Sequence, residues 1–351
     1  MRYVASSILL LALVLLLANC AFRQTPSQAL LAGFPEMRAK QGLQDADSPD
    51  LPFLAANRST GKDADFVLPG GMSYSTTGDL YISDNNGQTI HQWGVGNDRV
   101  HVFLSKNAVG KLEFPNAIQW ADNHIFVADN DGLKVFSVEG RFERLIRTYF
   151  TIFSFVVTPR STILVNPLIR KADANDPLII ELDSEGKRIR GFGLRHNEAN
   201  KNGVDDRAFL TVAKGLLFAA FKYRQSIDVY DLDSGNLVRT ITIKHSVLNQ
   251  LPDLLAHRSV AIDNRNLPTP RYIAGVRAIQ DQVFICLHLP QPEILVFDEE
   301  GRILKRFRVS TIAPAVDIFG FDARASGKNI QLAIGVLDPN WSSTVYELTM
   351  N

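Results

Sequence analysis

Cysteine and net charge are both nearly missing from this sequence. Cys20 and Cys286 are the only two cysteines in 351 residues, whereas a chain stabilised by disulfide bonds would carry more. Cys286 lies inside an apolar run and is expected to be a small buried side chain. The 37 basic and 37 acidic residues give no formal net charge. Without a long-range field to attract polyanions, we expect no nucleic-acid partner.

Motifs of catalysis are missing as well. The sequence has no Gly-x-Ser-x-Gly elbow, phosphate-binding loop, His-Glu-x-x-His or paired-cysteine metal motif. Its seven histidines are scattered, which is typical of strand and loop positions and not of a ligand set. A closed ring of repeats can still gather distant residues around its axis, so the scatter does not exclude a site.

The apolar run near the N-terminus is too short to cross a bilayer comfortably. Residues 8–18 follow Arg2 and match the apolar region of a signal peptide. The run ends Leu-Ala-Asn-Cys, which resembles a bacterial lipobox. That resemblance implies a lipoprotein signal peptide at residues 1–19 and lipidation of Cys20. An ordinary cleaved signal and a retained anchor are the alternatives.

The segment after the lipobox is expected to be a tether. Residues 20–50 are polar, are punctuated by prolines, and would hold the globular part away from the membrane. The lipobox resemblance implies a cell-envelope protein that is lipid-anchored to a membrane. In a Gram-negative cell, Ala21 after the cysteine is compatible with the outer membrane, facing the periplasm.

Residues 51–351 form the predicted propeller region, and one pattern recurs six times between Phe66 and Met350. Each copy has a strand, an acidic turn that contains glycine, and a strand of alternating apolar and basic residues, as in 296–307. Periods of about 40–50 residues with this content indicate propeller blades. We therefore predict an all-β fold, a six-bladed β-propeller of four-stranded antiparallel blades. The second strands are expected to begin near Leu80, Ile125, Ile163, Leu217, Val283 and Ile330.

The sixth repeat is one strand short. Its strands are predicted near 317–321, 330–336 and 344–349, after which the sequence stops. The extended segment 51–56 is spare at the other end of the propeller region. We predict that this N-terminal strand closes the sixth blade, because pairing it would leave no free sheet edge at the seam.

Two repeats resemble a known family. Ile-Ser-Asp-Asn-Asn-Gly at 82–87 and Val-Ala-Asp-Asn-Asp-Gly at 127–132 each follow a strand that contains proline. This pattern resembles the NHL repeat and bacterial six-bladed propeller lipoproteins that carry it. The Asp/Asn turns could suit calcium. Tight hairpin turns, in which Asn-Gly and Asp-Gly supply positive φ angles, are favoured instead, so no cofactor is expected.

The family resemblance also implies where a site would lie. Propeller enzymes with this repeat place their functional residues on loops at the mouth of the axial channel. Six-bladed lactonases hold calcium with a Glu, Asn, Asn and Asp set, but residues 69–73 offer no matching first-blade Glu. The candidate binding residues are Asp84, Asn85, Asn116, Asp129, Asn130, Arg195, His196, His257, Arg258 and Arg271.

Two long insertions and two basic segments complete the pattern. The insertions at 193–206 and 245–272 are long enough to be functional. Leucines at near-helical spacing in the second suggest a short helix packed on the ring or a partner-docking surface. The basic residues of 187–190 and 305–308 are assigned to exposed outer strands, where charge protects a sheet edge.

These observations favour a binding or scaffolding module that engages an envelope protein, a peptide or a glycan. The alternative is an NHL-like or lactonase-like enzyme with a metal or His/Arg site at the channel mouth. A purely structural envelope component is the third possibility.

Overall fold

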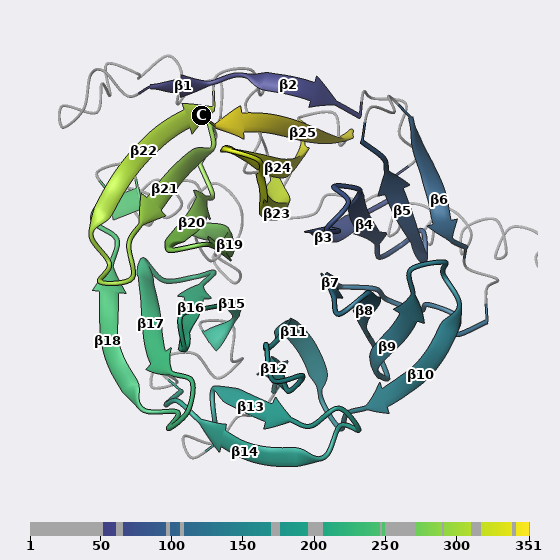
Figure 1. The fold of residues 1–351 in the computed structure, drawn as a ribbon. Coiled ribbons are helices and arrows are strands. Elements are labelled where there is room, and N and C mark those ends of the chain that lie inside the picture. The colour runs from purple at the N-terminus through teal and green to yellow at the C-terminus, as the bar shows by residue number, and fades with distance from the viewer. Residues whose placement is uncertain are drawn as a thin grey trace, which may run out of the picture. The chain divides into compact units, whose positions relative to one another are not determined.

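The propeller region folds into six β-sheets arranged around a central axis (Figure 1). The computed structural model describes residues 52–60, 66–95, 99–105, 109–169, 176–195, 206–245, 248–249, 271–289, 291–309, 317–338 and 342–350. Within each sheet the strands of a blade follow one another in the chain and pair antiparallel. The two N-terminal strands depart from this order, because each joins a sheet formed by later parts of the chain. The predicted fold class, an all-β six-bladed propeller, is confirmed.

In each blade the first strand lies at the axis and the following strands lie progressively further out (Figure 1). Blade one has β3 (Pro69–Tyr74), β4 (Leu80–Asp84), β5 (Thr89–Trp93) and β6 (Val100–Leu104). Blade two has β7 (Ala117–Ala121), β8 (His124–Asp129), β9 (Gly132–Ser137) and β10 (Phe142–Arg147). Blade three has β11 (Thr151–Val157), β12 (Ile163–Leu168), β13 (Ile179–Leu182) and β14 (Arg188–Phe192).

Blade four has β15 (Ala208–Ala213), β16 (Leu216–Phe221), β17 (Ser226–Asp231) and β18 (Leu237–Thr242). Blade five has β19 (Ile273–Ile279), β20 (Gln282–Leu287), β21 (Glu293–Phe297) and β22 (Ile303–Val309). Blade six begins with β23 (Asp317–Ser326), β24 (Asn329–Leu337) and β25 (Ser343–Met350).

The second strands carry the core. Every residue of β4 is buried, and in β16 and β20 only the first is not. Both faces of these strands pack against neighbouring blades, which is why they are apolar runs and not alternating sequences. All six second strands begin within one residue of the predicted positions.

The N-terminal segment closes the ring differently from the prediction. β2 (Ala56–Ser59) pairs antiparallel with β25 and is the fourth strand of blade six. β1 (Phe53–Leu54) instead pairs in parallel with β22, as a fifth strand of blade five. Closure by an N-terminal strand is thus confirmed, but assigning residues 51–56 to it was wrong. β2 is polar and alternates between half-buried and exposed residues, so it does not stand out as an apolar run.

Side chains join the inner strands of neighbouring blades. Ser73 Oγ accepts a hydrogen bond from the Trp120 N–H at 2.9 Å, and Gln119 Oε1 accepts one from the Val157 N–H at 2.9 Å. The other junctions are bridged by Ser154 to the Ala208 carbonyl (2.5 Å), Thr211 to the Ala278 N–H (2.9 Å), Arg277 to Asp322 (3.2 Å) and Asp322 to the Tyr74 N–H (2.7 Å). Each junction therefore has a polar bridge near the axis.

The basic outer strands lie where they were predicted, but some of their charges are paired. Arg188 and Lys305 are exposed. Arg190 on β14 binds Glu181 at 2.6 Å, and Arg306 on β22 binds the buried Glu293 at 2.8 Å. The outer strands are therefore fixed to their blades as well as protected from edge pairing.

Several predictions fall outside the described residues. These are the signal peptide at 1–19, the lipidation site Cys20, the tether at 20–50 and most of the insertion 245–272. The same holds for the candidates His196, His257 and Arg258. Of the helix expected in the insertion 245–272, the structure describes residues 248–249, which are helical, and Leu248 is buried among core residues of blades four and five. Within the described part of the chain, no helix has the length and apolar character needed to cross a membrane.

Candidate functional site

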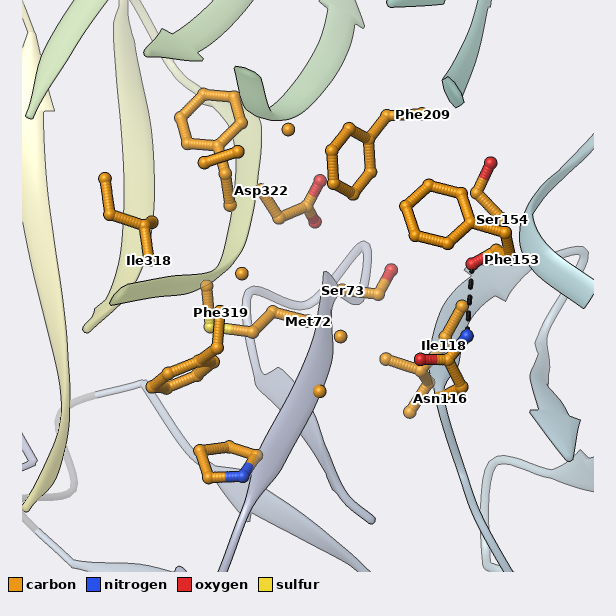
Figure 2. Close-up of a pocket in the computed structure, with 18 of the residues that line it drawn as sticks. Met72, Ser73, Asn116, Ile118, Phe153, Ser154, Phe209, Ile318, Phe319 and Asp322 are labelled. Atoms are coloured by element: carbon orange, nitrogen blue, oxygen red, sulfur yellow. Dashed lines mark hydrogen bonds between the residues drawn. The ribbon is translucent and has the colours of Figure 1, made fainter. Parts of the chain in front are cut away.

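A cavity of about 360 Å³ runs along the propeller axis. It is lined by the inner strands of all six blades, β3, β7, β11, β15, β19 and β23. Figure 2 shows Phe153 and Phe209 close together on its wall, with Ser73 and Asp322 nearby. The two aromatic rings are 5.2 Å apart. The lining therefore combines apolar surface with a few polar groups, as ligand pockets generally do.

Glycines let the inner strands approach closely on one side of the cavity. A Cβ atom added to Gly71 of β3 would lie 3.1 Å from the Cα of Ala117 on β7. A Cβ on Gly320 of β23 would lie 3.0 Å from the Met72 side chain. Blades six, one and two are thus tightly packed at the axis.

Equivalent positions in successive blades supply the polar groups at one end of the cavity. An inner strand begins where the second strand of the same blade ends, since the two are antiparallel. Asn85 thus donates its N–H to the Leu68 carbonyl in blade one, and Lys222 donates its N–H to the Arg207 carbonyl in blade four. We call this end, with Asn85, Asn116, Lys222, Arg271 and Asp317, the channel mouth.

Lys222 is the distinctive group of the channel mouth. It is half-buried, lines the cavity, and has its amine 5.7 Å from the centre of the Phe153 ring. Within the described residues, no side chain or carbonyl accepts a hydrogen bond from its Nζ, and no carboxylate pairs with it. Burial and, to a smaller extent, the nearby charge of Arg271 together lower the pKa of Lys222 to about 7, against the opposing effect of Asp317.

Beside Lys222, Arg271 and His288 share one carboxylate. Asp317 accepts a hydrogen bond from Arg271 on one oxygen and contacts His288 Nε2 at 2.8 Å on the other. Burial would raise the pKa of Asp317, but His288 and Arg271 more than offset this and hold it well below its usual value. Asp317 is therefore ionised at neutral pH and balances the charge of Arg271.

Arg207 and Tyr223 border the same region. The Arg207 guanidinium lies 3.3 Å from the Tyr223 hydroxyl and 6.0 Å from the centre of the Phe153 ring. The Nε of Arg207 is buried and has no partner in the described part of the chain. Lys222 also lies over the Tyr223 ring, at 5.9 Å. Lys222 and Arg207 thus lie against the same two aromatic rings, and neither has a carboxylate partner in the described residues.

Asn85 and Asn116 line the cavity on the side of blades one and two. Asn116 donates through Nδ2 to the carbonyls of Ile152 at 3.1 Å and Phe153 at 3.3 Å, and Figure 2 shows the second bond. This ties blade two to blade three. The Oδ1 of Asn85 is buried and has no hydrogen-bond partner among the described residues. Asn85 is therefore an available acceptor at the mouth.

The candidates Asp84, Asp129 and Asn130 do not line the cavity. Asp84 accepts N–H bonds from Val67 at 2.7 Å, Leu68 at 2.8 Å and Gly87. These bonds tie the entry into the inner strand of blade one to its middle hairpin. In that hairpin the residue with positive φ is Gln88 and not the predicted Gly87.

Asp129 plays the same part in blade two. Its carboxylate accepts from the Glu113 N–H at 2.9 Å, from the Asn130 N–H at 2.9 Å and from the buried Lys134 ammonium at 2.7 Å. Burial would raise its pKa, but Lys134 and the backbone donors lower it overall. Both aspartates are occupied in holding their blades together.

Arg195 is also engaged inside the protein. It is buried, donates to the Pro167 carbonyl at 3.3 Å and lies 3.7 Å from Asp206. Desolvation lowers its pKa. Arg195 thus holds together the two ends of the first insertion. Of the predicted candidates, Asn85, Asn116 and Arg271 come together at the channel mouth.

Lys222, Asp317, His288 and Tyr223 were not predicted from the sequence. A usable signal was present, because Asn85, Asn130, Lys222 and His288 each follow a predicted second strand. That position was recognised only where an Asp-Asn turn resembled the family pattern. Among the described residues, no three His, Cys, Asp or Glu side chains are grouped so as to hold a metal ion.

No protein-family model and no curated protein matches the sequence. Several solved propellers match the structure. A luciferin-regenerating enzyme has a TM-score of 0.55 at 10% identity, over 83% of this chain and 93% of that chain. Regucalcin from Agrobacterium tumefaciens, a calcium-binding protein, has a TM-score of 0.55 at 11% identity, over 86% and 98%. A gluconolactonase from Xanthomonas campestris has 0.53 at 14% identity, over 85% and 95%. At these identities the similarity establishes the fold alone.

Proposed function

We propose that this protein is a lipid-anchored, exported propeller that binds a ligand carrying a carboxylate or phosphate group at the channel mouth. The observation that carries the proposal is Lys222, whose amine lines the cavity without an acceptor in the described part of the chain. A cation taken out of water is costly unless it is paired, and a bound anion would supply the missing partner.

The surroundings of Lys222 favour an organic anion over a bare inorganic ion. Phe153 and Phe209 form an apolar wall beside the amine. Arg207 and Arg271 add positive charge, and Asn85 offers an acceptor for a hydrogen-bond donor of the ligand. An envelope peptide with a free C-terminus, a glycan with an acidic sugar and a small carboxylate all have this chemistry.

Binding of such an anion would be linked to pH. Lys222, with a pKa of about 7, would take up a proton when the anion binds, because the charged amine is stabilised by its new partner. Affinity is therefore expected to fall as pH rises from 6 to 9, by about tenfold per pH unit above the pKa.

Calorimetric titration of the full chain with a panel of carboxylates, phosphates and matched neutral amides tests the proposal. Lys222→Met is expected to lose binding of the anions, and Lys305→Met, at an exposed outer-strand position, is expected to retain it. Equal affinity for the neutral amides, or unchanged binding by Lys222→Met, would contradict the anion site.

The anchor is part of the same proposal and rests on the lipobox-like sequence at residues 17–20. A Cys20→Ala variant should move from the membrane fraction to the soluble fraction. Cys286→Ala is the matched control, since that thiol is buried within β20 and should not affect fractionation. Membrane fractionation that is the same for Cys20→Ala and the wild type would refute the anchor.

A second candidate is hydrolysis of a lactone. The gluconolactonase similarity supplies the precedent for the fold, and the His288 imidazole, which contacts Asp317 at 2.8 Å, would serve as the proton acceptor. The test is titration of acid released from glucono-δ-lactone, with and without calcium. Loss of activity in His288→Ala would support this candidate, and equal rates with and without the protein would remove it.

A further inference from the structure

The Lys222 amine has the surroundings of a nucleophile. Its Nζ lies 5.7 Å from the centre of the Phe153 ring and 5.9 Å from that of Tyr223, in the wall of the cavity. In the part of the chain that the structure describes, no acceptor holds its protons. A lysine in such surroundings keeps a reactive lone pair at neutral pH.

We propose that Lys222 forms an imine with the carbonyl group of a 2-oxo acid bound at the channel mouth. This inference rests on the proposed anion site and specifies its ligand class. The carboxylate would be held by positive charge, and the adjacent carbonyl carbon would then lie at the amine.

The positive charge comes from neighbouring blades. Arg271 lines the cavity close enough to depress the pKa of Lys222 to about 7, together with burial, which is the larger cause. Its pairing with Asp317 fixes the guanidinium in place. The Arg207 guanidinium lies 6.0 Å from the centre of the Phe153 ring, with a buried Nε that is unpaired in the described residues. In a 2-oxo acid the carboxylate lies next to the carbonyl group. At the channel mouth the arginine cations lie near the Lys222 amine, so the two arrangements match.

The chemistry balances without a co-reactant. The Nζ lone pair attacks the carbonyl carbon and forms a C–N bond. The carbonyl oxygen then leaves as water, and both hydrogens of that water come from the amine. An imine to the 2-oxo acid remains, and addition of water reverses the reaction.

The direct test is reductive trapping on the full chain. Pyruvate and sodium cyanoborohydride are added at pH 7, and peptide mapping by mass spectrometry locates the reduced adduct. Lys222 is expected to be labelled faster than the exposed Lys305 by on the order of 100-fold, because a far larger share of its amine is unprotonated. Acetone, a ketone without a carboxylate, should label Lys222 far more slowly than pyruvate.

A conservative variant separates this inference from the proposed anion site. Lys222→Arg keeps a positive charge but cannot form an imine, so it should bind acetate or pyruvate while giving no adduct. Lys222→Met should lose both, and Lys305→Arg should lose neither. Near-ultraviolet circular dichroism of each variant verifies that the fold is intact.

The outcomes are distinct. Anion binding by the wild type without an adduct at Lys222 would overturn the imine and leave the anion site standing. Equal labelling of Lys222 and Lys305 would also overturn it. Equal labelling of Lys222 by acetone and pyruvate would overturn the 2-oxo acid class. Failure of every anion to bind would remove the proposed function itself.

Discussion

Asp322 accepts a hydrogen bond from the backbone N–H of Tyr74 at 2.7 Å, and this bond joins the last blade of the ring to the first. The other oxygen of Asp322 binds Arg277 of blade five at 3.2 Å. Burial raises the pKa of Asp322, and Arg277 and the backbone donors only partly oppose this. One buried carboxylate thus connects three blades at the axis.

Replacing that carboxylate should weaken ring closure. Asp322→Ala leaves the Tyr74 N–H and the Arg277 guanidinium without their buried acceptor, which should cost about 3–5 kcal/mol. Urea unfolding followed by tryptophan fluorescence measures the change. The control is Asp281→Ala, which removes an exposed ion pair with Lys214 and should change stability by less than about 1 kcal/mol. Similar losses in the two variants would show that Asp322 does not close the ring.

A second group that joins the two ends of the ring is Arg58 on β2. It pairs with Glu347 at 3.2 Å and lies 3.9 Å above the Trp93 ring, so it links blade six to blade one. Arg58→Ala should destabilise the protein by about 1–3 kcal/mol, because it removes both a partly buried ion pair and a cation–π contact.

Thermal unfolding of Arg58→Ala beside Arg141→Ala provides the comparison. Arg141 is exposed on a turn of blade two and pairs with Glu139 at 3.5 Å. Its removal is expected to change stability by less than about 0.5 kcal/mol. An Arg58→Ala protein with wild-type stability would mean that β2 is held by its backbone pairing alone.

Lys222 should reduce stability in a pH-dependent way. Its folded-state pKa of about 7 lies below the ordinary value of 10.5, so the folded state binds fewer protons between these values. Stability of the wild type should therefore rise from pH 7 towards pH 10, and the burial penalty should be complete below pH 7. Lys222→Met removes the penalty and should stabilise the protein at pH 6 by roughly 1–3 kcal/mol.

Urea unfolding at pH 6 and pH 9.5 measures the difference in free energy of unfolding between Lys222→Met and the wild type. This difference should be smaller at pH 9.5. Lys305→Met, at an exposed position, should show no such trend. A Lys222→Met variant that is less stable than the wild type at pH 6 would indicate that the amine has a stabilising partner.

Asp129 differs from Lys222 in that its charged form stabilises the folded state. Its pKa is lowered by Lys134 and backbone donors despite burial, so its contribution is present above the ordinary carboxyl pKa of about 3.9 and is lost as pH falls below it. Asp129→Asn should cost about 2–4 kcal/mol at pH 7. The difference in free energy of unfolding between Asp129→Asn and the wild type should become smaller when unfolding is followed at successively lower pH. A difference that does not change with pH would assign the loss to packing.

Hairpin and blade positions followed from local sequence. The runs at Leu80, Leu217 and Val283 are apolar on both faces because they lie between two blades, so they are visible without a structure. β2 is polar and is defined by its partner β25, and β1 pairs with β22 through two residues only. The order of these pairings could not be deduced from their own composition.

The same contrast between local sequence and tertiary structure applies to the candidate site. Local sequence was enough to define the six blades, since each blade is a meander whose strands are recognisable from periodicity and turns. The channel mouth, in contrast, exists only in the folded ring. Lys222, Arg271 and Asp317 come from three successive blades, and their charges interact because the inner strands converge on one axis. No local pattern records that convergence, so Asp84 and Asp129 looked like the site while the Lys222 amine did not.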